Sequence, residues 1–306
     1  MKNINTITLN RLAYQDNQII EEVDLAFVPW ETNTMDSAFL NCQNLTNVTN
    51  INGNVTNMIN AFANCINLVN APVIPSSVTD MSLTFSGCFK LVNAPEIPNS
   101  VTNMCNTFIN CDSLNIAPVI PNSVVDMSGT FGYCFKLVNA PEIPNSVTNM
   151  CNTFQWCTNL VNAPVIPSSV TDMSLTFSRC FKLVNAPEIP NSVTNMYYTF
   201  WDCYNLTGDI NILSENISNA TNCFYNAPLN KDVYIPFKNN DVYTQTYNSF
   251  INAGYSTTER VNGVRLFDLN GPDIDLSDYE YTIDEQNNVT LTKYIGSNID
   301  IVTPHL

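Results

Sequence analysis

Hydrophobic residues return along most of this chain at a fixed interval of 23 residues. Methionine, phenylalanine, cysteine and leucine each occupy one column of the repeat, and polar residues fill most positions between them. The cysteine column contains Cys42, Cys65, Cys88, Cys111, Cys134, Cys157, Cys180 and Cys203. Because each unit can bury its apolar face only against its neighbours, these columns predict a solenoid of stacked coils.

The first half of each unit has the spacing of a short helix. Met81, Phe85 and Cys88 stand at i, i+4 and i+7, which is one helical face. Asp80 precedes them, where a side-chain oxygen can cap the helix start. Asparagine holds the same position in other units, at Asn103, Asn149 and Asn195.

The second half of each unit predicts a short extended stretch through Leu91, Ala94 and Ile97 that ends at a proline. Stacked coils would place these strands about 4.8 Å apart in a parallel sheet. We therefore expect an α/β solenoid resembling leucine-rich repeats, with a parallel sheet on one side and short helices on the other.

The repeat divides the chain into three regions. Residues 1–30 lack it and are predicted to cap the first coil or to attach the protein to an assembly, residues 31–236 form the solenoid, and residues 237–306 form a small α+β module. In that module we expect a helix at 246–255 and strands at 264–269, 281–283 and 289–294.

The repeat resembles a known family. The string V-T-N-M-x-x-T-F-x-x-C-x-x-L, seen at residues 101–114, is similar to the BspA-type leucine-rich repeat. Members are mostly surface adhesins of bacteria and some protists, and similar repeats occur in bacteriophage virion proteins. The segment A-P-x-I-P departs from the family pattern, because it places a proline inside the usual strand.

A second interval, twice as long, is superimposed on the first. The x of A-P-x-I-P is glutamate at Glu96, Glu142 and Glu188 and valine in the units between them. Lysine alternates in the same way at Lys90, Lys136 and Lys182. This spacing reduces repulsion between like charges, but recent duplication of a two-unit segment would leave the same pattern.

Composition restricts the partners. The chain has 306 residues and a formal net charge of −16, from 11 Lys and Arg against 27 Asp and Glu. Such a charge disfavours nucleic acids and anionic bilayers. No apolar run approaches the roughly 18 residues of a membrane span. The N-terminus lacks the apolar core of a signal peptide, and its initial Met favours a protein that is not exported by that route.

The cysteines are expected to be buried thiols that act as small apolar residues. The single histidine, His305, and the missing close cysteine pairs argue against zinc, so no metal or cofactor is predicted. Cys105 and Cys151 lie two coils apart, about 10 Å, and cannot bond to each other. The acidic loop at 271–278 could hold calcium only loosely, since it matches no defined coordination loop.

No motif of a nucleophile, phosphate loop or metalloprotease is present, so catalytic residues are not predicted. An enzyme that acts on glycans through Asp273 or Asp275 of the C-terminal module remains an alternative.

Recognition is expected in the variable columns instead. The position before the ladder cysteine becomes aromatic or basic late in the array, and neighbouring positions add further rings. The candidate binding residues are Tyr133, Trp156, Arg179, Trp201, Tyr197, Tyr198 and Tyr204. Such side chains are enriched at protein contacts, although they could also be ordinary surface residues.

We therefore predict a non-enzymatic binding or structural protein. Its leading assignment is a bacteriophage virion component on the virion surface, such as a tail or head fibre, a receptor-binding protein or a decoration protein. Its partners would be a host-surface protein or glycan or neighbouring virion proteins, without membrane insertion, and a homo-oligomer is a further option. The first alternative is a BspA-like adhesin on a bacterial cell surface.

Overall fold

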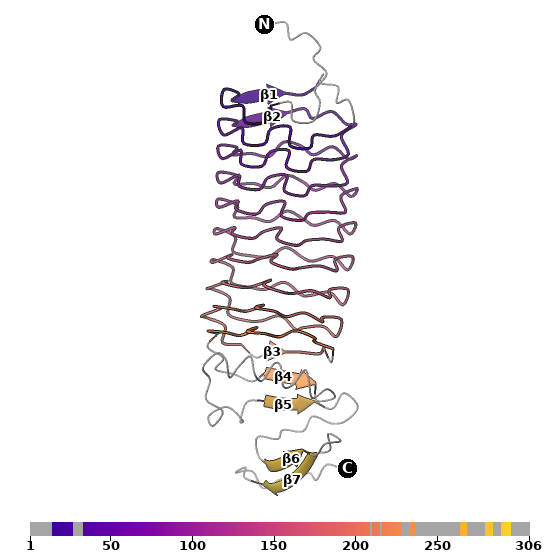
Figure 1. Ribbon diagram of the computed structural model, residues 1–306, viewed down its shortest axis with the longest axis vertical. Helices are drawn as coiled ribbons and strands as arrows, with labels where there is room; N and C mark the ends of the chain where they lie inside the picture. The colour runs from indigo at the N-terminus through magenta and orange to yellow at the C-terminus, as the bar shows by residue number, and fades with distance from the viewer. Residues whose placement is uncertain are drawn as a thin grey trace, which may run out of the picture.

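The coils stack along one axis and form a rod (Figure 1). The structure, a computed structural model, describes residues 14–26, 33–208, 210–214 and 216–227 and the backbone of four later strands. The predicted helix at 246–255, the acidic loop at 271–278 and the residues Asp273 and Asp275 lie outside the described residues.

Parallel pairing joins successive coils, as predicted. At the first coil, β1 (Glu22–Asp24) pairs with β2 (Asn47–Thr49). In the central coils the pairing is confined to single-residue bridges, for example Asp80 with Asn103 and Asn93 with Ile116. The prolines of A-P-x-I-P explain this limit, because they remove backbone donors from the segment that would otherwise extend the strand.

The strands predicted at 264–269, 281–283 and 289–294 are present, although the first ends at residue 267 and the second begins at residue 279. β3 (Ile210–Asn211) pairs in parallel with β4 (Val233–Pro236), and β4 pairs in parallel with β5 (Val264–Phe267). β6 (Tyr279–Ile283) and β7 (Val289–Tyr294) pair in antiparallel fashion. Parallel pairing thus continues past residue 236, while a separate module at 237–306 stays a prediction.

The predicted short helices are wrong, since the described residues contain strands, bridges and turns but no helix. In the segment that begins at Met81, alternate amides donate to the next coil: Met81 to the carbonyl of Asn103 at 3.0 Å, and Phe85 to that of Thr107 at 2.9 Å. The amides of Thr84 and Ser86 instead donate three residues back within the coil, to the carbonyls of Met81 and Leu83. Leu83 and Gly87 have φ of +56° and +70°, which no α-helix contains.

Asp80 accepts a hydrogen bond from a backbone amide, as predicted, but the amide belongs to a turn and not to a helix. Its Oδ1 accepts the amide of Ser82 at 2.8 Å, and the asparagines of this column bind in the same way, as Asn103 does with the amide of Cys105. In two coils a side-chain amide also donates to the carboxylate of the preceding coil, from Asn103 Nδ2 to Asp80 Oδ2 and from Asn195 Nδ2 to Asp172 Oδ2, both at 3.2 Å. The column therefore stabilises both the turn and the stack.

The core consists of columns that run the length of the rod. The predicted methionine, phenylalanine, cysteine and leucine columns are all fully buried from Met35 to Leu206. Adjacent phenylalanine rings stack with centroids 5.4 to 5.8 Å apart. Tyr14 extends this ladder beyond Phe39 at the N-terminal end. Residues 14–25 cover the first coil in this way, with Leu25 also fully buried.

The buried thiols and threonine hydroxyls of the core have hydrogen-bond partners in the neighbouring coil. The thiol of Cys111 donates to the carbonyl of Phe85, one coil earlier, at 3.2 Å, and the other ladder cysteines repeat this contact. The hydroxyl of Thr84 donates to carbonyls of two coils, at Met58 and Met81. Cysteine and threonine thus satisfy carbonyls that an alkyl side chain would leave with fewer donors.

No stretch of helix in the described part of the chain has the length and apolar character needed to cross a lipid bilayer.

Candidate functional site

The residue before each ladder cysteine has a left-handed backbone conformation. We call these positions the left-handed column, and their φ values lie between +58° and +70°. The column contains Asn41, Asn64, Gly87, Asn110, Tyr133, Trp156, Arg179 and Asp202, and also Asn226, which precedes Ala227 where alanine takes the place of the ladder cysteine. Trp156 is the third residue of a turn in which the amide of Cys157 donates to the carbonyl of Phe154 at 3.0 Å. A positive φ at this position is the mark of a type II turn.

Asparagine and glycine tolerate this conformation, and they fill the column in the first coils. There the side chains bind one another, as Asn64 Nδ2 donates to Asn41 Oδ1 at 2.8 Å. Tyr133, Trp156 and Arg179 adopt the same conformation at a cost, because bulky residues are rarely left-handed. Strained residues of this kind cluster at functional sites, so these side chains are the first candidates for recognition.

A stack along the rod contains these three side chains and Trp201. The rings of Tyr133 and Trp156 lie 5.8 Å apart at 19°. The guanidinium carbon of Arg179 lies 4.3 Å from the ring centre of Trp156 and 4.4 Å from that of Trp201. Cation–π contact with two tryptophans holds this arginine in place.

The remaining candidates join the same surface. Tyr198 contacts Trp201 edge to face at 5.0 Å, and Tyr197 contacts Tyr198 at 4.3 Å. Tyr204 stacks on Phe181 at 5.3 Å, and Phe181 meets Trp156 edge to face at 5.9 Å. The structure therefore brings all seven predicted residues together. We call them, with Phe135 and Phe181, the aromatic patch.

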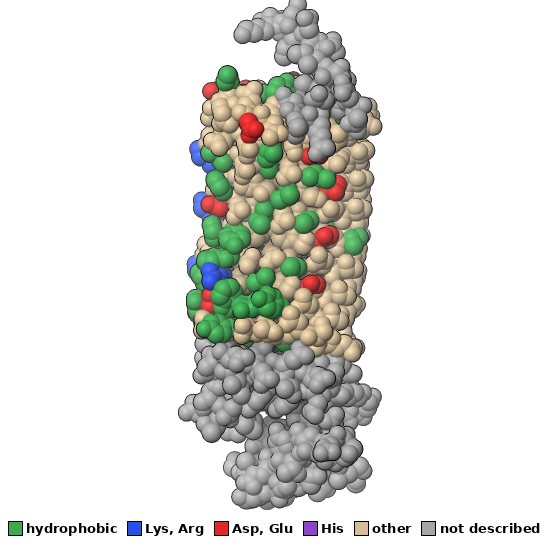
Figure 2. All heavy atoms as spheres, viewed as in Figure 1, with side chains coloured by type: hydrophobic (Ala, Val, Ile, Leu, Met, Phe, Trp, Pro, Cys, Tyr) green, Lys and Arg blue, Asp and Glu red, His purple; other side chains and the backbone are tan. Residues whose placement is uncertain are grey.

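The patch lies toward the C-terminal end of the described rod. Figure 2 shows hydrophobic side chains gathered there near one edge of the face in view, with a basic group among them. Tyr197 and Tyr204 are the most exposed of its large side chains, at 38% and 50%.

Sequence reasoning missed three residues of this site. Phe135 contacts Tyr133 edge to face at 6.3 Å, and Phe181 links Trp156 to Tyr204. Both belong to the column after the ladder cysteine, where an aromatic residue returns in every second unit at Phe89, Phe135 and Phe181. That periodicity could have revealed them. Asp202, the third, is a member of the left-handed column.

Asp202 neutralises the positive charge within the patch. Its Oδ2 lies 3.1 Å from Arg179 Nε, and its Oδ1 accepts a hydrogen bond from Asn226 Nδ2 at 2.8 Å. The two ion-paired side chains are 27% and 9% exposed. Loss of solvent, and then the negative charge of Asp202, raises the pKa of Tyr204 above its usual value. Tyr204 therefore presents a neutral hydroxyl near pH 7.

Within the stack, Trp156 leaves its ring edge rather than a ring face for a partner. Trp156 has Tyr133 from the preceding coil on one face and Arg179 from the following coil on the other. Arg179 likewise covers a face of Trp201. A sugar ring that packs on a tryptophan needs an open face, so this geometry suits a flat apolar contact better.

The described residues were compared with the requirements of a metal site and of a reactive thiol. They contain no group of three or more His, Cys, Asp or Glu side chains that could hold a metal ion. The ladder thiols are buried, and burial raises the pKa of Cys88 to about 12, so this thiol is a poor nucleophile.

Comparisons with known proteins identify the repeat. The family model for the BspA type Leucine rich repeat region matches residues 32–153 and 127–253, with 6 copies. Together these segments cover more than half of the chain. Curated protein sequences give no match.

Solved structures with similarity to this chain are repeat proteins of bacteria. A leucine-rich repeat protein of T. pallidum has 25% identity and a TM-score of 0.45, over 64% of this chain and 81% of that chain. A leucine-rich repeat protein of Bacteroides ovatus has 18% identity and a TM-score of 0.35, over 81% and 88%. A leucine rich cell surface protein of Faecalibacterium prausnitzii has 17% identity and a TM-score of 0.26, over 68% and 83%.

Proposed function

Because the chain belongs to the BspA-type leucine-rich repeat family, we propose that it is an adhesion scaffold without enzymatic activity that binds a partner through the aromatic patch. The observation that carries this proposal is the left-handed column. Asparagine would satisfy the backbone at Tyr133, Trp156 and Arg179, as it does at Asn64, yet larger side chains stand there and stack into one surface.

The patch has the composition and the rigidity of a contact site. Tyrosine, tryptophan and arginine are the residues that contribute most binding energy at interfaces. Stacking between coils fixes these side chains before a partner arrives, so little rotamer entropy is lost on binding. The ion pair of Arg179 with Asp202 also leaves the patch without an unpaired charge to desolvate.

A protein surface is the partner class that this geometry supports best. The covered faces of Trp156 favour a flat apolar contact over a stacked sugar ring. The neutral hydroxyl of Tyr204 adds a polar group at an exposed position.

Two settings remain for this contact. The family match supports an adhesin on a bacterial cell surface or in the extracellular space. The bacteriophage virion component predicted from the sequence would use the same patch on a host-surface protein. Genes for capsid and tail proteins beside this gene would favour the virion setting, and an upstream export signal would favour the adhesin.

The experiment compares Trp156→Asn and Trp201→Ala with the unmodified chain, each fluorescently labelled and added to intact cells of a candidate host panel. Asparagine at position 156 relieves a left-handed cost of about 1–2 kcal/mol and removes aromatic stacking worth about 0.5–1.5 kcal/mol. Stability should therefore stay within about 1 kcal/mol of the unmodified chain, whereas cell binding should fall at least tenfold.

Asn64→Gly, at the same column four coils away, is the matched control and should leave binding unchanged. Protease treatment of the cells should abolish binding, and periodate oxidation of their glycans should not. Unchanged binding by Trp156→Asn and Trp201→Ala on cells that bind the unmodified chain would remove the assignment of the patch.

A further inference from the structure

A second regular surface runs along the proline segments, apart from the aromatic patch. Its most exposed column is the x of A-P-x-I-P, which we call the valine–glutamate ridge. The ridge consists of Val73, Glu96, Val119, Glu142, Val165 and Glu188. Its three valines are 86% to 87% exposed, which is unusual for β-branched apolar residues at regular intervals.

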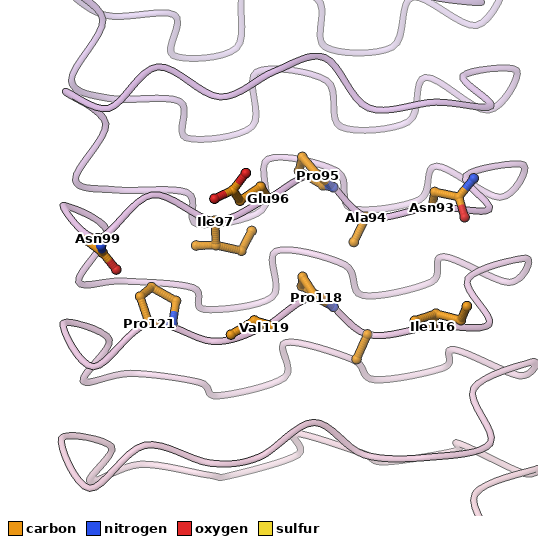
Figure 3. A pocket seen from close by; sticks show the side chains of 11 residues that line it. Asn93, Ala94, Pro95, Glu96, Ile97, Asn99, Ile116, Pro118, Val119 and Pro121 are labelled. Carbon is orange, nitrogen blue, oxygen red and sulfur yellow. The ribbon is translucent and has the colours of Figure 1, made fainter.

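Hollows separate the coils beside this ridge. One of about 400 Å³ has Pro95, Glu96 and Ile97 on one coil and Pro118 and Val119 on the next (Figure 3). The preceding pair of coils has a similar hollow of about 480 Å³. Prolines explain these openings, because the described backbone has no hydrogen bond between coils from Ala94 to Ile97.

The acidic groups of the ridge are not neutralised by the protein. Within the described part of the chain, the carboxylates of Glu96 and Glu142 have no ion pair and no hydrogen-bond donor. Glu188 accepts one bond, from Asn211 Nδ2 at 2.7 Å. With a net charge of −16, a second copy of this chain would be repelled, and a basic partner would be attracted.

The spacing of the ridge defines the partner further. The glutamates of the ridge recur every two coils, and so do the valines. Two coils span about 9.6 Å at the spacing of parallel strands. A polyproline II segment advances about 3.1 Å per residue, so three residues span about 9.3 Å. A fully extended strand advances about 3.3 Å per residue and nearly fits as well.

We propose that the valine–glutamate ridge docks an extended segment of another protein that carries lysine or arginine at every third residue. Each cation meets one glutamate, and the residues between cations pack against the intervening valine and the prolines beside it. Contact with Glu96, Glu142 and Glu188 covers four coil spacings, or about 19 Å. This inference is independent of the aromatic patch and of the setting of the protein.

Fluorescence anisotropy with labelled synthetic peptides tests the proposal on the full chain. The probe repeats Lys-Pro-Pro five times. The control peptide has the same composition, with its lysines in one block. The three-residue repeat should bind at least tenfold more tightly than the block peptide, because only its cations match the glutamates.

Two triple variants separate the ridge from the overall charge. Glu96→Gln, Glu142→Gln and Glu188→Gln together should weaken binding of the repeat peptide at least tenfold. Asp80→Asn, Asp126→Asn and Asp172→Asn remove as many charges at the same spacing in another column, and should reduce binding less than twofold. Asparagine already occupies that column in alternate coils, so the fold tolerates the control.

A third variant, Val119→Asn, should lower affinity severalfold without changing charge. Equal affinity for the two peptides, or equal loss in the two triple variants, would mean unspecific attraction and would overturn the proposal. So would a glutamate variant that binds normally. Urea unfolding of each variant confirms that it is folded, and Trp156→Asn should leave peptide binding unchanged.

Discussion

At the scale of single residues, adjacent positions of the repeat differ in backbone conformation and in burial. In the left-handed column the backbone requires a positive φ, and asparagine or glycine meets that requirement most easily. One residue later, the cysteine is fully buried, and its thiol donates to a carbonyl of the preceding coil. A variable position used for contact thus adjoins an invariant position used for packing.

Phe108 illustrates the energetic weight of a core position. It is fully buried, with Phe85 at 5.7 Å and Phe131 at 5.8 Å on its two sides. Phe108→Ala should lower the free energy of unfolding by about 3–5 kcal/mol, because a cavity forms and both stacked neighbours lose a contact. Urea unfolding measures this loss. A change below about 1 kcal/mol would contradict the burial of this column.

At the scale of the element, the Met-to-Cys segment replaces a helix by a turn sequence that only the stack stabilises. Four of its amides, those of Met81, Leu83, Phe85 and Gly87, point to carbonyls of the following coil. In an α-helix that begins at Met81, the amides of Phe85 and Gly87 would instead be satisfied within the segment itself, by the carbonyls of Met81 and Leu83. The coil therefore depends on its neighbours for hydrogen bonds as well as for burial.

The cysteine ladder makes this element sensitive to alkali. Burial raises the pKa of Cys88 from 9.0 to about 12 and raises the pKa of Cys111 and Cys134 as well. The unfolded chain releases these protons near pH 9, while the folded chain still binds them. The stability that these thiols contribute is therefore fully present well below pH 9 and falls as the pH rises through 9 toward 12.

Urea unfolding at pH 7.5, 9 and 10.5 checks this expectation. The free energy of unfolding should already be lower at pH 9 than at pH 7.5, because each unfolded thiol is half deprotonated there, and lower again at pH 10.5. The double variant Cys88→Ala and Cys111→Ala, although less stable at pH 7.5, should lose less stability between pH 9 and 10.5. An equal alkaline loss in that variant would show that other groups cause it.

At the scale of the whole molecule, the two-coil interval controls which charges become neighbours. Asp80 is followed on its column by Asn103 and then by Asp126, and Asn103 donates to the carboxylate of Asp80. The same interval separates the glutamates of the ridge from one another, and likewise Lys90, Lys136 and Lys182. Like charges are thus about 10 Å apart rather than about 5 Å.

Two single-coil deletions test whether this interval matters. Deleting residues 101–123 places Asp80 beside Asp126, Lys90 beside Lys136, and Glu96 beside Glu142. Deleting residues 78–100 removes the same length and brings only uncharged pairs together. The first variant should be less stable by about 1–2 kcal/mol in low salt, given three exposed repulsions at about 5 Å.

Urea unfolding of both deletion variants in low salt and in 1 M salt measures the difference. It should shrink in 1 M salt, because screening weakens exposed charge pairs. Equal stability of the two variants in low salt would favour recent duplication as the whole origin of the pattern.

The candidate site could be predicted from the sequence only in part. The aromatic and basic residues of the left-handed column stood out because they vary where other columns are constant. Phe181 and Asp202 were missed, because their contribution depends on side-chain directions across neighbouring coils. Those directions follow from the positive φ of the column. The asparagines and glycines in the sequence are consistent with a positive φ but do not establish it.

The sequence by itself determined the solenoid, its 23-residue coils and its buried columns. A residue that recurs at a constant interval can be buried only if the units stack, and Met, Phe, Cys and Leu recur without a shift. It did not determine the backbone of each coil, because the spacing i, i+4, i+7 fits both one helical face and this succession of turns. Only the tertiary structure decided between them, since the carbonyls that accept the amides of one coil belong to the next.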